Sequence, residues 1–259
     1  IEMSSQGASL AGCLTVTTDD GFRENYDVIA PMMDEKNLSA SFFISTDFID
    51  NKDLMWRNRL AYLINEFPLN DVLHEAHLLP ARHLKKVKNL RNVKDLMAWT
   101  LKDWDTRKKD IYSSQLWDKF MPKINEFLNE NKPYLTTQQI KELHSSGFDI
   151  CSHSCSHPDL SNASWDDYKH EVLSSIQRLR EITNQRRVSF SYPFGRRAPD
   201  EFESRLIEKY SEDVSSLMGI YNVNRNGRNP YKWERDLQED TINMSKFRFF
   251  ILPILRKII

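Results

Sequence analysis

The spacing of apolar residues changes along the chain and predicts strands and helices in turn. Residues 10–17 are rich in β-branched side chains, which predicts a strand. Apolar residues then recur at helical spacing, at Tyr26, Ile29, Met33 and Leu38. The segment SASFFIST, residues 39–46, has the character of a buried strand. A strand, a turn, a helix and a second strand form the βαβ unit of a parallel sheet, whose functional groups gather at the carboxyl ends of the strands.

The same order of elements returns in the second half of the chain. Thr136 and Gln139 form a candidate capping box, which predicts a helix that ends near Gly147. The later elements that we predict are a strand at 148–151, a helix at 164–182, a strand at 188–192, a helix at 199–210 and a strand at 214–220, followed by mostly loop over 220–236. The fold class predicted from this order is α/β.

Residues 47–134 depart from this order, because their apolar residues stand three and four apart with charges between them. We expect a helical insertion in this range, within a single domain that spans residues 1–259. The insertion holds four of the six tryptophans, Trp56, Trp99, Trp104 and Trp117. Aromatic residues at helical spacing usually pack together, so we interpret these four as the core of the insertion rather than as a substrate platform.

Charge and cysteine content narrow the class of protein. The 36 basic and 37 acidic residues nearly cancel, which argues against a nucleic-acid-binding protein. Three cysteines are too few for a disulfide framework and favour a reducing compartment. The longest apolar run is shorter than the ~20 residues of a membrane span, and no signal peptide is evident. We therefore expect a cytoplasmic protein without a transmembrane segment. Its oligomeric state is left open.

Three polar motifs stand at the carboxyl ends of predicted strands. They are Asp19-Asp20-Gly21, His153-x3-His157-Pro158 and Tyr192-Pro193-Phe194-Gly195. Two histidines four residues apart can direct nitrogens to one point, and a carboxylate from another strand completes a two-histidine, one-carboxylate metal site. A divalent ion in such a site lowers the pKa of its water toward ~7 and polarises a carbonyl group.

The two adjacent carboxylates of Asp19 and Asp20 repel each other, and a metal site gives each a separate task. We assign Asp20 to the metal, together with His153 and His157, and Asp19 to the base that accepts a proton. Gly21 lets the backbone turn tightly beneath them. The cofactor predicted is a divalent metal, Zn²⁺ first, with Co²⁺, Ni²⁺ or Mn²⁺ as alternatives.

Four segments of the chain resemble the successive motifs of the polysaccharide deacetylase (NodB-type, carbohydrate esterase family 4-like) family. They are TVTTDDGF, SASFFIST, LTTQQIKELHSSGFDICSHSCSHPDLS and FSYPFGRRAP, so the resemblance covers roughly residues 10–46 and 134–200. It implies a distorted (β/α) barrel and a metal-dependent hydrolase that removes acetyl groups from N-acetylated sugars. By motif, Asp19 corresponds to the base of the family. Asp20, His153 and His157 correspond to its metal ligands, and the backbone N–H of Phe194 to its oxyanion donor.

The chain also departs from the family. Thr18 replaces an aromatic residue, and Ser191 stands in the motif where many members have the arginine that steadies the base. Arg196, Arg197 and Arg235 are the candidates to replace that arginine. No histidine follows His170, so the late histidine that protonates the leaving amine is missing, and Asp19 is expected to return the proton itself. We predict substrate contacts for four residues of this region and its surroundings, namely Tyr192, Pro193, Arg196 and Arg235.

The expected function is deacetylation of an N-acetylated saccharide or glycan, in the biosynthesis or modification of a bacterial surface polysaccharide such as an O-antigen-like lipopolysaccharide. Two alternatives remain: a hydrolase of a non-sugar, cyclic amide, and a carbohydrate-binding homologue with weak or no turnover.

Two further segments carry predictions of their own. In CSHSCSH, a strand would place Cys151, His153, Cys155 and His157 on one face, as in a structural zinc site. Pro158 and the lack of paired Cys-x2-Cys spacing argue against that interpretation. The apolar tail at 245–259 carries four cations, and we expect it to dock against the barrel rather than to lie on a membrane.

Overall fold

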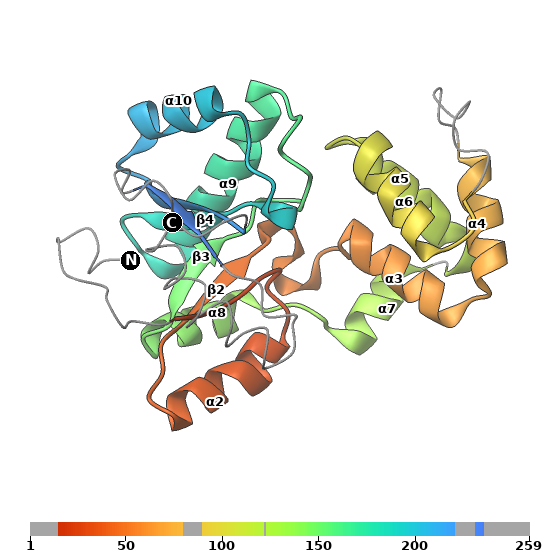
Figure 1. Cartoon of the computed structure of the whole chain (residues 1–259). Helices are drawn as coiled ribbons and strands as arrows, with labels where there is room; N and C mark the ends of the chain where they lie inside the picture. The colour runs from red at the N-terminus through yellow and green to blue at the C-terminus, as the bar shows by residue number, and fades with distance from the viewer. Residues whose placement is uncertain (1–14, 80–89, 122, 221–230, 236–259) are drawn as a thin grey trace, which may run out of the picture.

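The structure, a computed structural model, describes residues 15–79, 90–121, 123–220 and 231–235 (Figure 1). Within these ranges, six strands form one sheet in the order of the sequence, and every neighbouring pair is parallel. The strands are β1 (Val16–Thr18), β2 (Ala40–Ile44), β3 (Asp149–Ser152), β4 (Val188–Ser191), β5 (Val214–Gly219) and β6 (Lys232–Glu234). The predicted parallel α/β organisation is confirmed.

Strand β6 corrects the sequence-based prediction, which placed mostly loop over residues 220–236. It pairs with residues Leu217–Gly219 of β5. A strand of three residues is too short to show a period in its apolar residues, so only its partner reveals it.

Helices pack against one face of the sheet, the face that carries Phe42, Ile150 and Leu217. The elements outside the insertion are a π-helical turn (Asn25–Ile29), α2 (Ala30–Glu35), α8 (Thr137–Ser145), α9 (Trp165–Thr183), α10 (Asp200–Tyr210) and a 3-10 segment (Pro193–Gly195). A second 3-10 segment (Thr46–Asn51) leads into the insertion. The capping box of α8 is present, because the Thr136 hydroxyl accepts from the Gln139 N–H at 3.2 Å while the Gln139 side chain accepts from the Thr136 N–H at 2.9 Å. Between helices and sheet lies an apolar core that includes Phe42, Ile150, Val172, Leu179, Phe190, Leu206 and Leu217.

Among the described residues of the range predicted for the insertion, five helices gather at one end of the molecule (Figure 1). They are α3 (Trp56–Glu66), α4 (Leu69–Leu78), α5 (Val93–Asp103), α6 (Lys108–Phe120) and α7 (Ile124–Asn131). Their apolar side chains form a second core, in which the four tryptophans are at most 6% exposed. The interpretation of these tryptophans as core residues is confirmed, and the division into one domain with an insertion stays a prediction.

Tyr134 connects the second core to the strand ends. Its hydroxyl accepts hydrogen bonds from the Met55 N–H at 3.0 Å and from the Asn58 side chain at 2.7 Å, at the start of α3. Its ring stacks on Phe22, just beyond β1, with 5.7 Å between centroids. The first helix of the insertion is thereby fixed next to the carboxyl ends of the strands.

The apolar tail at 245–259 lies outside the described residues. Among the helices of the described part of the chain, none is both long and apolar enough to cross a lipid bilayer.

We expect Leu60→Ala to lower the free energy of unfolding by about 2–5 kcal/mol, because Leu60 is fully buried in the second core and its truncation leaves a cavity. Urea denaturation measures the loss. Leu78→Ala is the matched control, since Leu78 is 63% exposed on α4 and its truncation should change stability by less than about 0.5 kcal/mol. Equal losses in the two variants would contradict the described packing.

Candidate metal centre

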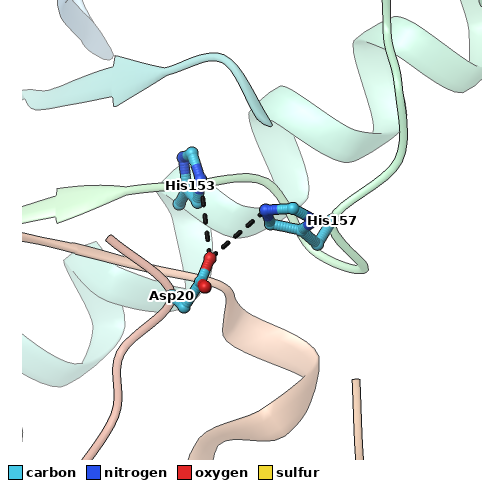
Figure 2. Close-up of side chains that lie close together, drawn as sticks. All are labelled: Asp20, His153 and His157. Atoms are coloured by element: carbon cyan, nitrogen blue, oxygen red, sulfur yellow. Dashed lines mark ion pairs between the residues drawn. The ribbon is translucent and has the colours of Figure 1, made fainter. Parts of the chain in front are cut away.

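Asp20, His153 and His157 direct their side chains to one point (Figure 2). Oδ1 of Asp20 lies 3.2 Å from Nε2 of His157 and 3.7 Å from Nε2 of His153. One ligand atom from each residue lies within 4.8 Å of the others. Asp20 follows β1 and the histidines follow β3, so the carboxyl ends of two parallel strands meet here, as the motifs predicted.

The turn that presents Asp20 depends on Gly21. Both residues have left-handed backbones, with φ of 73° at Asp20 and 81° at Gly21. A Cβ on Gly21 would lie 2.8 Å from Cγ2 of Ile44, in the neighbouring strand β2. Glycine is therefore required for both the backbone angle and the close approach of β2.

The loop 153–157 is held by the segment that follows β2. The His153 N–H donates to the carbonyl of Ile44 at 2.9 Å, and the carbonyls of Ser154 and Cys155 each accept from a backbone N–H of that segment at 3.1 Å. Ser154 and His157 have φ of 71° and 58°, which non-glycine residues rarely adopt. These hydrogen bonds maintain the unusual backbone that aims both imidazoles at Asp20.

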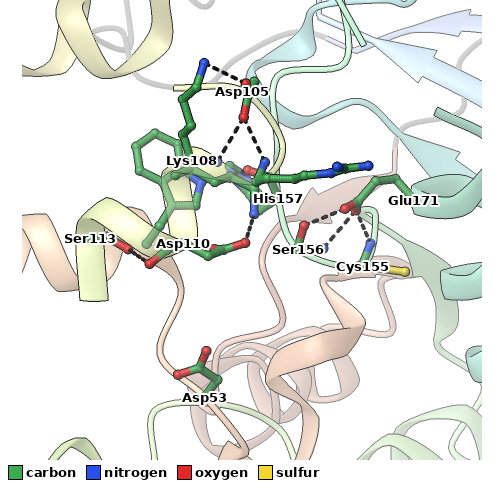
Figure 3. A network of polar contacts seen from close by, with 12 residues as sticks. Asp53, Asp105, Lys108, Asp110, Ser113, Cys155, Ser156, His157 and Glu171 are labelled. Carbon is green, nitrogen blue, oxygen red and sulfur yellow. Dashed lines mark hydrogen bonds and ion pairs between the residues drawn. The ribbon is translucent and has the colours of Figure 1, made fainter. Parts of the chain in front are cut away.

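Glu171 of α9 fixes the same loop from the other side (Figure 3). Its carboxylate accepts hydrogen bonds from the backbone N–H groups of Cys155 and Ser156, each at 2.9 Å, and from the Ser156 hydroxyl at 2.5 Å. Glu171 is 6% exposed. Nothing in the sequence motif points to it, because its role depends on how α9 packs against the loop.

The orientation of His153 follows from its hydrogen bond. Its Nδ1 lies 2.9 Å from the carbonyl oxygen of Ser191, which can only accept, so Nδ1 carries the proton and Nε2 presents a lone pair to Asp20. Burial lowers the pKa of His153, which favours the neutral imidazole that a metal requires.

The donor set fits a divalent cation. Oδ1 of Asp20 is buried and accepts no hydrogen bond from the described residues. Burial alone would raise the pKa of Asp20, but its interactions with His157 and His153 lower it to about 2, so the carboxylate stays ionised. One ionised oxygen and two imidazole nitrogens that converge on one point suit Zn²⁺ or a related ion.

Among the described residues, Asp19, unlike Asp20, forms an ion pair with an arginine, Arg235. Nη1 and Nη2 of Arg235 lie 2.6 and 2.8 Å from its two carboxylate oxygens, and Nη2 also donates to Ser191 Oγ at 2.5 Å. Burial would raise the pKa of Asp19, but His153 and Arg235 together bring it below its usual value. Arg235 follows β6 and Asp19 follows β1, so this pair joins the two edge strands of the sheet.

Phe194 borders the candidate centre. Its ring packs edge-on against His157, with centroids 4.8 Å apart, and its backbone is left-handed with φ of 58°. The next residue, Gly195, has φ of 65°, and a Cβ there would lie 1.7 Å from Cγ1 of Ile220. The loop after β4 can therefore take this path only with glycine at 195.

Comparison with known proteins identifies the relationship. A family model described as polysaccharide deacetylase matches residues 99–210, a range that includes both histidines and Phe194. This part of the chain is therefore similar to the polysaccharide deacetylase family. This confirms the resemblance carried by the sequence motifs. No curated protein matches the sequence significantly.

Solved deacetylase structures share the fold. A Streptococcus pyogenes deacetylase, PplD, determined in complex with acetate, has a TM-score of 0.51 at 15% identity, over 91% of this chain and 69% of that one. A de-N-acetylase from Aggregatibacter actinomycetemcomitans has a TM-score of 0.50 at 14% identity, over 95% of this chain and 79% of that one. The predicted distorted (β/α) barrel is confirmed at the level of the fold.

The three arginine candidates have separate partners in the structure. Arg235 faces Asp19, whereas Arg196 pairs with Asp159 at 2.8 Å and Arg197 pairs with Glu203 and Glu234 at 2.8 and 2.7 Å. Arg235 therefore stands beside the carboxylate that the missing family arginine would steady.

The four residues predicted to contact the substrate differ in their solvent exposure. Tyr192 has no exposed surface, and its hydroxyl lies 2.9 Å from that of Tyr168 in the core. Pro193 is also buried, and of the four predicted residues Arg196 alone is exposed. The positions of Tyr192 and Pro193 do not favour the substrate contacts predicted for them, because their side chains support the loop from beneath.

The alternative zinc site with two cysteines disagrees with the structure. Strand β3 ends at Ser152, so the alternation that would align the four side chains stops before His153. Cys151 packs against Phe43 and Met218. The donor group found among the described residues includes neither Cys151 nor Cys155.

Two neighbours of the centre, Trp56 and Arg57, were missed by the sequence motifs. Trp56 Nε1 donates to the carbonyl of His157 at 2.9 Å, and the Arg57 guanidinium lies 4.9 Å from the centre of the Phe194 ring. Both belong to the first turn of α3, so the insertion contacts the candidate centre directly.

We expect His157→Ala to weaken zinc binding by more than about 100-fold, because it removes one of three ligand atoms, a larger loss than that of a supporting residue. Isothermal titration calorimetry with Zn²⁺ gives the affinity. His170→Ala, at an exposed position of α9 outside the donor group, should bind zinc like the wild type. Undiminished affinity in His157→Ala would remove this residue from the site.

Removal of the Asp19 partner should change stability in a pH-dependent way. Since the pKa of Asp19 is lowered on folding, its pairing stabilises the protein above about pH 4, and this stabilisation is lost as the pH falls through the lowered pKa. We expect Arg235→Gln to cost about 1–3 kcal/mol at pH 7 in the metal-free protein, and less at pH 3.

Denaturant unfolding at the two pH values, with a chelator present, measures the effect of Arg235→Gln. The matched control is Arg186→Gln, whose partner Glu212 is a surface residue, and which should leave stability unchanged. A cost for Arg235→Gln that is the same at pH 3 and pH 7 would show that the charge of Asp19 does not take part.

Proposed function

We propose that this chain is a divalent-metal-dependent hydrolase that removes acetyl groups from N-acetylated sugars, in the synthesis or modification of a bacterial surface polysaccharide. The observation that carries the proposal is the convergence of Asp20, His153 and His157 beside a second carboxylate, Asp19, which has a separate partner. The match of residues 99–210 to the polysaccharide deacetylase family model supports the reaction class. An O-antigen-like or other lipopolysaccharide is the polymer that we propose.

Asp20, His153 and His157 would hold the cation, with Zn²⁺ favoured by the two nitrogen ligands. When bound, the ion supplies Lewis acidity, which polarises the acetyl carbonyl and favours deprotonation of the attacking water. Asp19 lies beside this point, since its Oδ2 is 3.7 Å from His153 Nε2. The pairing with Arg235 keeps Asp19 ionised and therefore able to accept the proton of the water.

In this proposal, water adds to the carbonyl carbon, and the backbone N–H of Phe194 donates a hydrogen bond to the negative oxygen that develops. The C–N bond then breaks. Asp19 returns its proton to the leaving nitrogen, because no histidine follows His170 in the sequence. Acetate and a free amine are the products.

The missing late histidine also favours a second candidate, a carbohydrate-binding homologue that retains the metal centre without turnover. Acetate release distinguishes the two, since a binding homologue would bind N-acetylglucosamine oligomers and release none. Hydrolysis of hydantoin, a cyclic amide, in place of these oligomers would instead favour the non-sugar alternative.

We expect Asp19→Asn to reduce acetate release from N-acetylglucosamine oligomers by about 10²–10⁴-fold, because an amide cannot accept the proton of the water. Zinc affinity, measured by calorimetry on the same variant, should be retained, since Asp19 is assigned no metal bond. Asp34→Asn, the same exchange at an exposed position of α2, is the control and should release acetate at the wild-type rate. Full activity in Asp19→Asn would overturn its assignment as the base.

A further inference from the structure

Arg57 brings a positive charge from the insertion to the edge of the candidate metal centre. It is half-buried in the first turn of α3, with its guanidinium 4.9 Å from the centre of the Phe194 ring and 5.9 Å from that of Trp56. The Phe194 ring in turn packs edge-on against His157, with ring centroids 4.8 Å apart. The guanidinium therefore lies one aromatic ring away from a residue that would hold the cation.

Within the described part of the chain, no hydrogen-bond or ion-pair partner for the Arg57 side chain is found. Three other arginines of the described residues are paired: Arg59 with Asp53, Arg197 with Glu203 and Arg235 with Asp19. An aromatic ring attracts the flat face of a guanidinium group. The N–H groups along the edge of the guanidinium then stay available to donate hydrogen bonds. That edge is the part of arginine that binds carboxylate or phosphate in a bidentate manner.

The charges around the centre point to the nature of the ligand. Two carboxylates, Asp19 and Asp20, are matched by two guanidinium groups, Arg235 and Arg57, and the histidine ligands of a metal are neutral. A divalent cation would then leave two positive charges without a matching carboxylate among these residues. A site with this balance attracts an anionic ligand more strongly than a neutral one.

We propose that Arg57 binds an anionic group of the substrate, so that the N-acetylated glycan on which the enzyme acts is acidic. The group is a carboxylate or a phosphate close to the acetylated nitrogen. This inference rests on the proposed function and adds the substrate class to it. Arg57 is then a specificity-determining residue that the insertion contributes to the barrel.

A purely structural role for Arg57 predicts a different result. If Arg57 only positioned the Phe194 loop through its contact with the ring, its loss would affect neutral and acidic glycans equally. The effect would also depend little on ionic strength, whereas a charge–charge contact with a ligand weakens as salt is added.

The test is isothermal titration calorimetry on the zinc-loaded protein with three probes. A tetramer of N-acetylglucosamine is neutral, a tetrasaccharide of alternating N-acetylglucosamine and glucuronic acid carries carboxylates, and UDP-N-acetylglucosamine carries phosphates. We expect at least one acidic probe to bind about tenfold more tightly than the neutral tetramer at low salt, and this preference to fall as salt is raised. Which acidic probe binds identifies the anionic group.

Arg57→Gln should remove most of the preference for the acidic probe, and Arg57→Lys, which keeps the charge but not the bidentate edge, should retain part of it. Arg91→Gln makes the same change of charge at an exposed position before α5 and should keep the preference. Acetate release from the same saccharides is followed in parallel.

An equal loss of affinity for neutral and acidic probes in Arg57→Gln would overturn the proposal, as would a wild-type protein without any preference. In either case acetate release from the neutral tetramer would leave the deacetylase assignment standing. If the zinc-loaded protein neither bound nor deacetylated any of the saccharides, the proposed function would fail together with this inference.

Discussion

The structure around the candidate centre depends on how two adjacent carboxylates keep their charges in a partly buried place. Asp19 and Asp20 are neighbours in the chain, and both have lowered pKa values although burial opposes ionisation. Arg235 neutralises Asp19 through two hydrogen bonds, while Oδ1 of Asp20 is left facing two imidazole nitrogens. One carboxylate is thereby suited to a cation and the other to proton transfer. The two carboxylates take different roles because the ends of different strands lie beside them.

The sheet itself makes this division possible. Strands in sequential, parallel order bring the ends of β1, β3, β4 and β6 to one edge, and the curl of the sheet carries Arg235 from the last strand to the first. The insertion completes the surroundings, since Trp56 donates to the His157 carbonyl and Arg57 covers Phe194. Helix α3 of the insertion lies outside the sequence motifs, yet it contacts the site at which we propose that the chemistry takes place.

The sequence predicted those parts of the centre that depend on local order. Asp20, His153 and His157 could be grouped because each follows a recognisable strand and carries a metal-binding side chain. Arg235 could only be named as one candidate of three, since it lies 216 residues from Asp19 and follows a strand too short to recognise. Glu171 and Arg57 were not predicted, because only tertiary packing brings them to the loop and to Phe194. The burial of Tyr192 could not be predicted for a similar reason: all four residues of β4 are buried, and its continuation enters the core.

We propose that one divalent cation binds Asp20, His153 and His157 while Asp19 stays with Arg235. The decisive experiment is a crystal structure of the zinc-loaded protein, with anomalous diffraction recorded at the zinc edge. We expect one strong anomalous peak in contact with Asp20, Nε2 of His153 and Nε2 of His157, and an intact Asp19–Arg235 pair. A peak bound by Asp19, or a zinc ion held elsewhere while these three side chains stay empty, would contradict it.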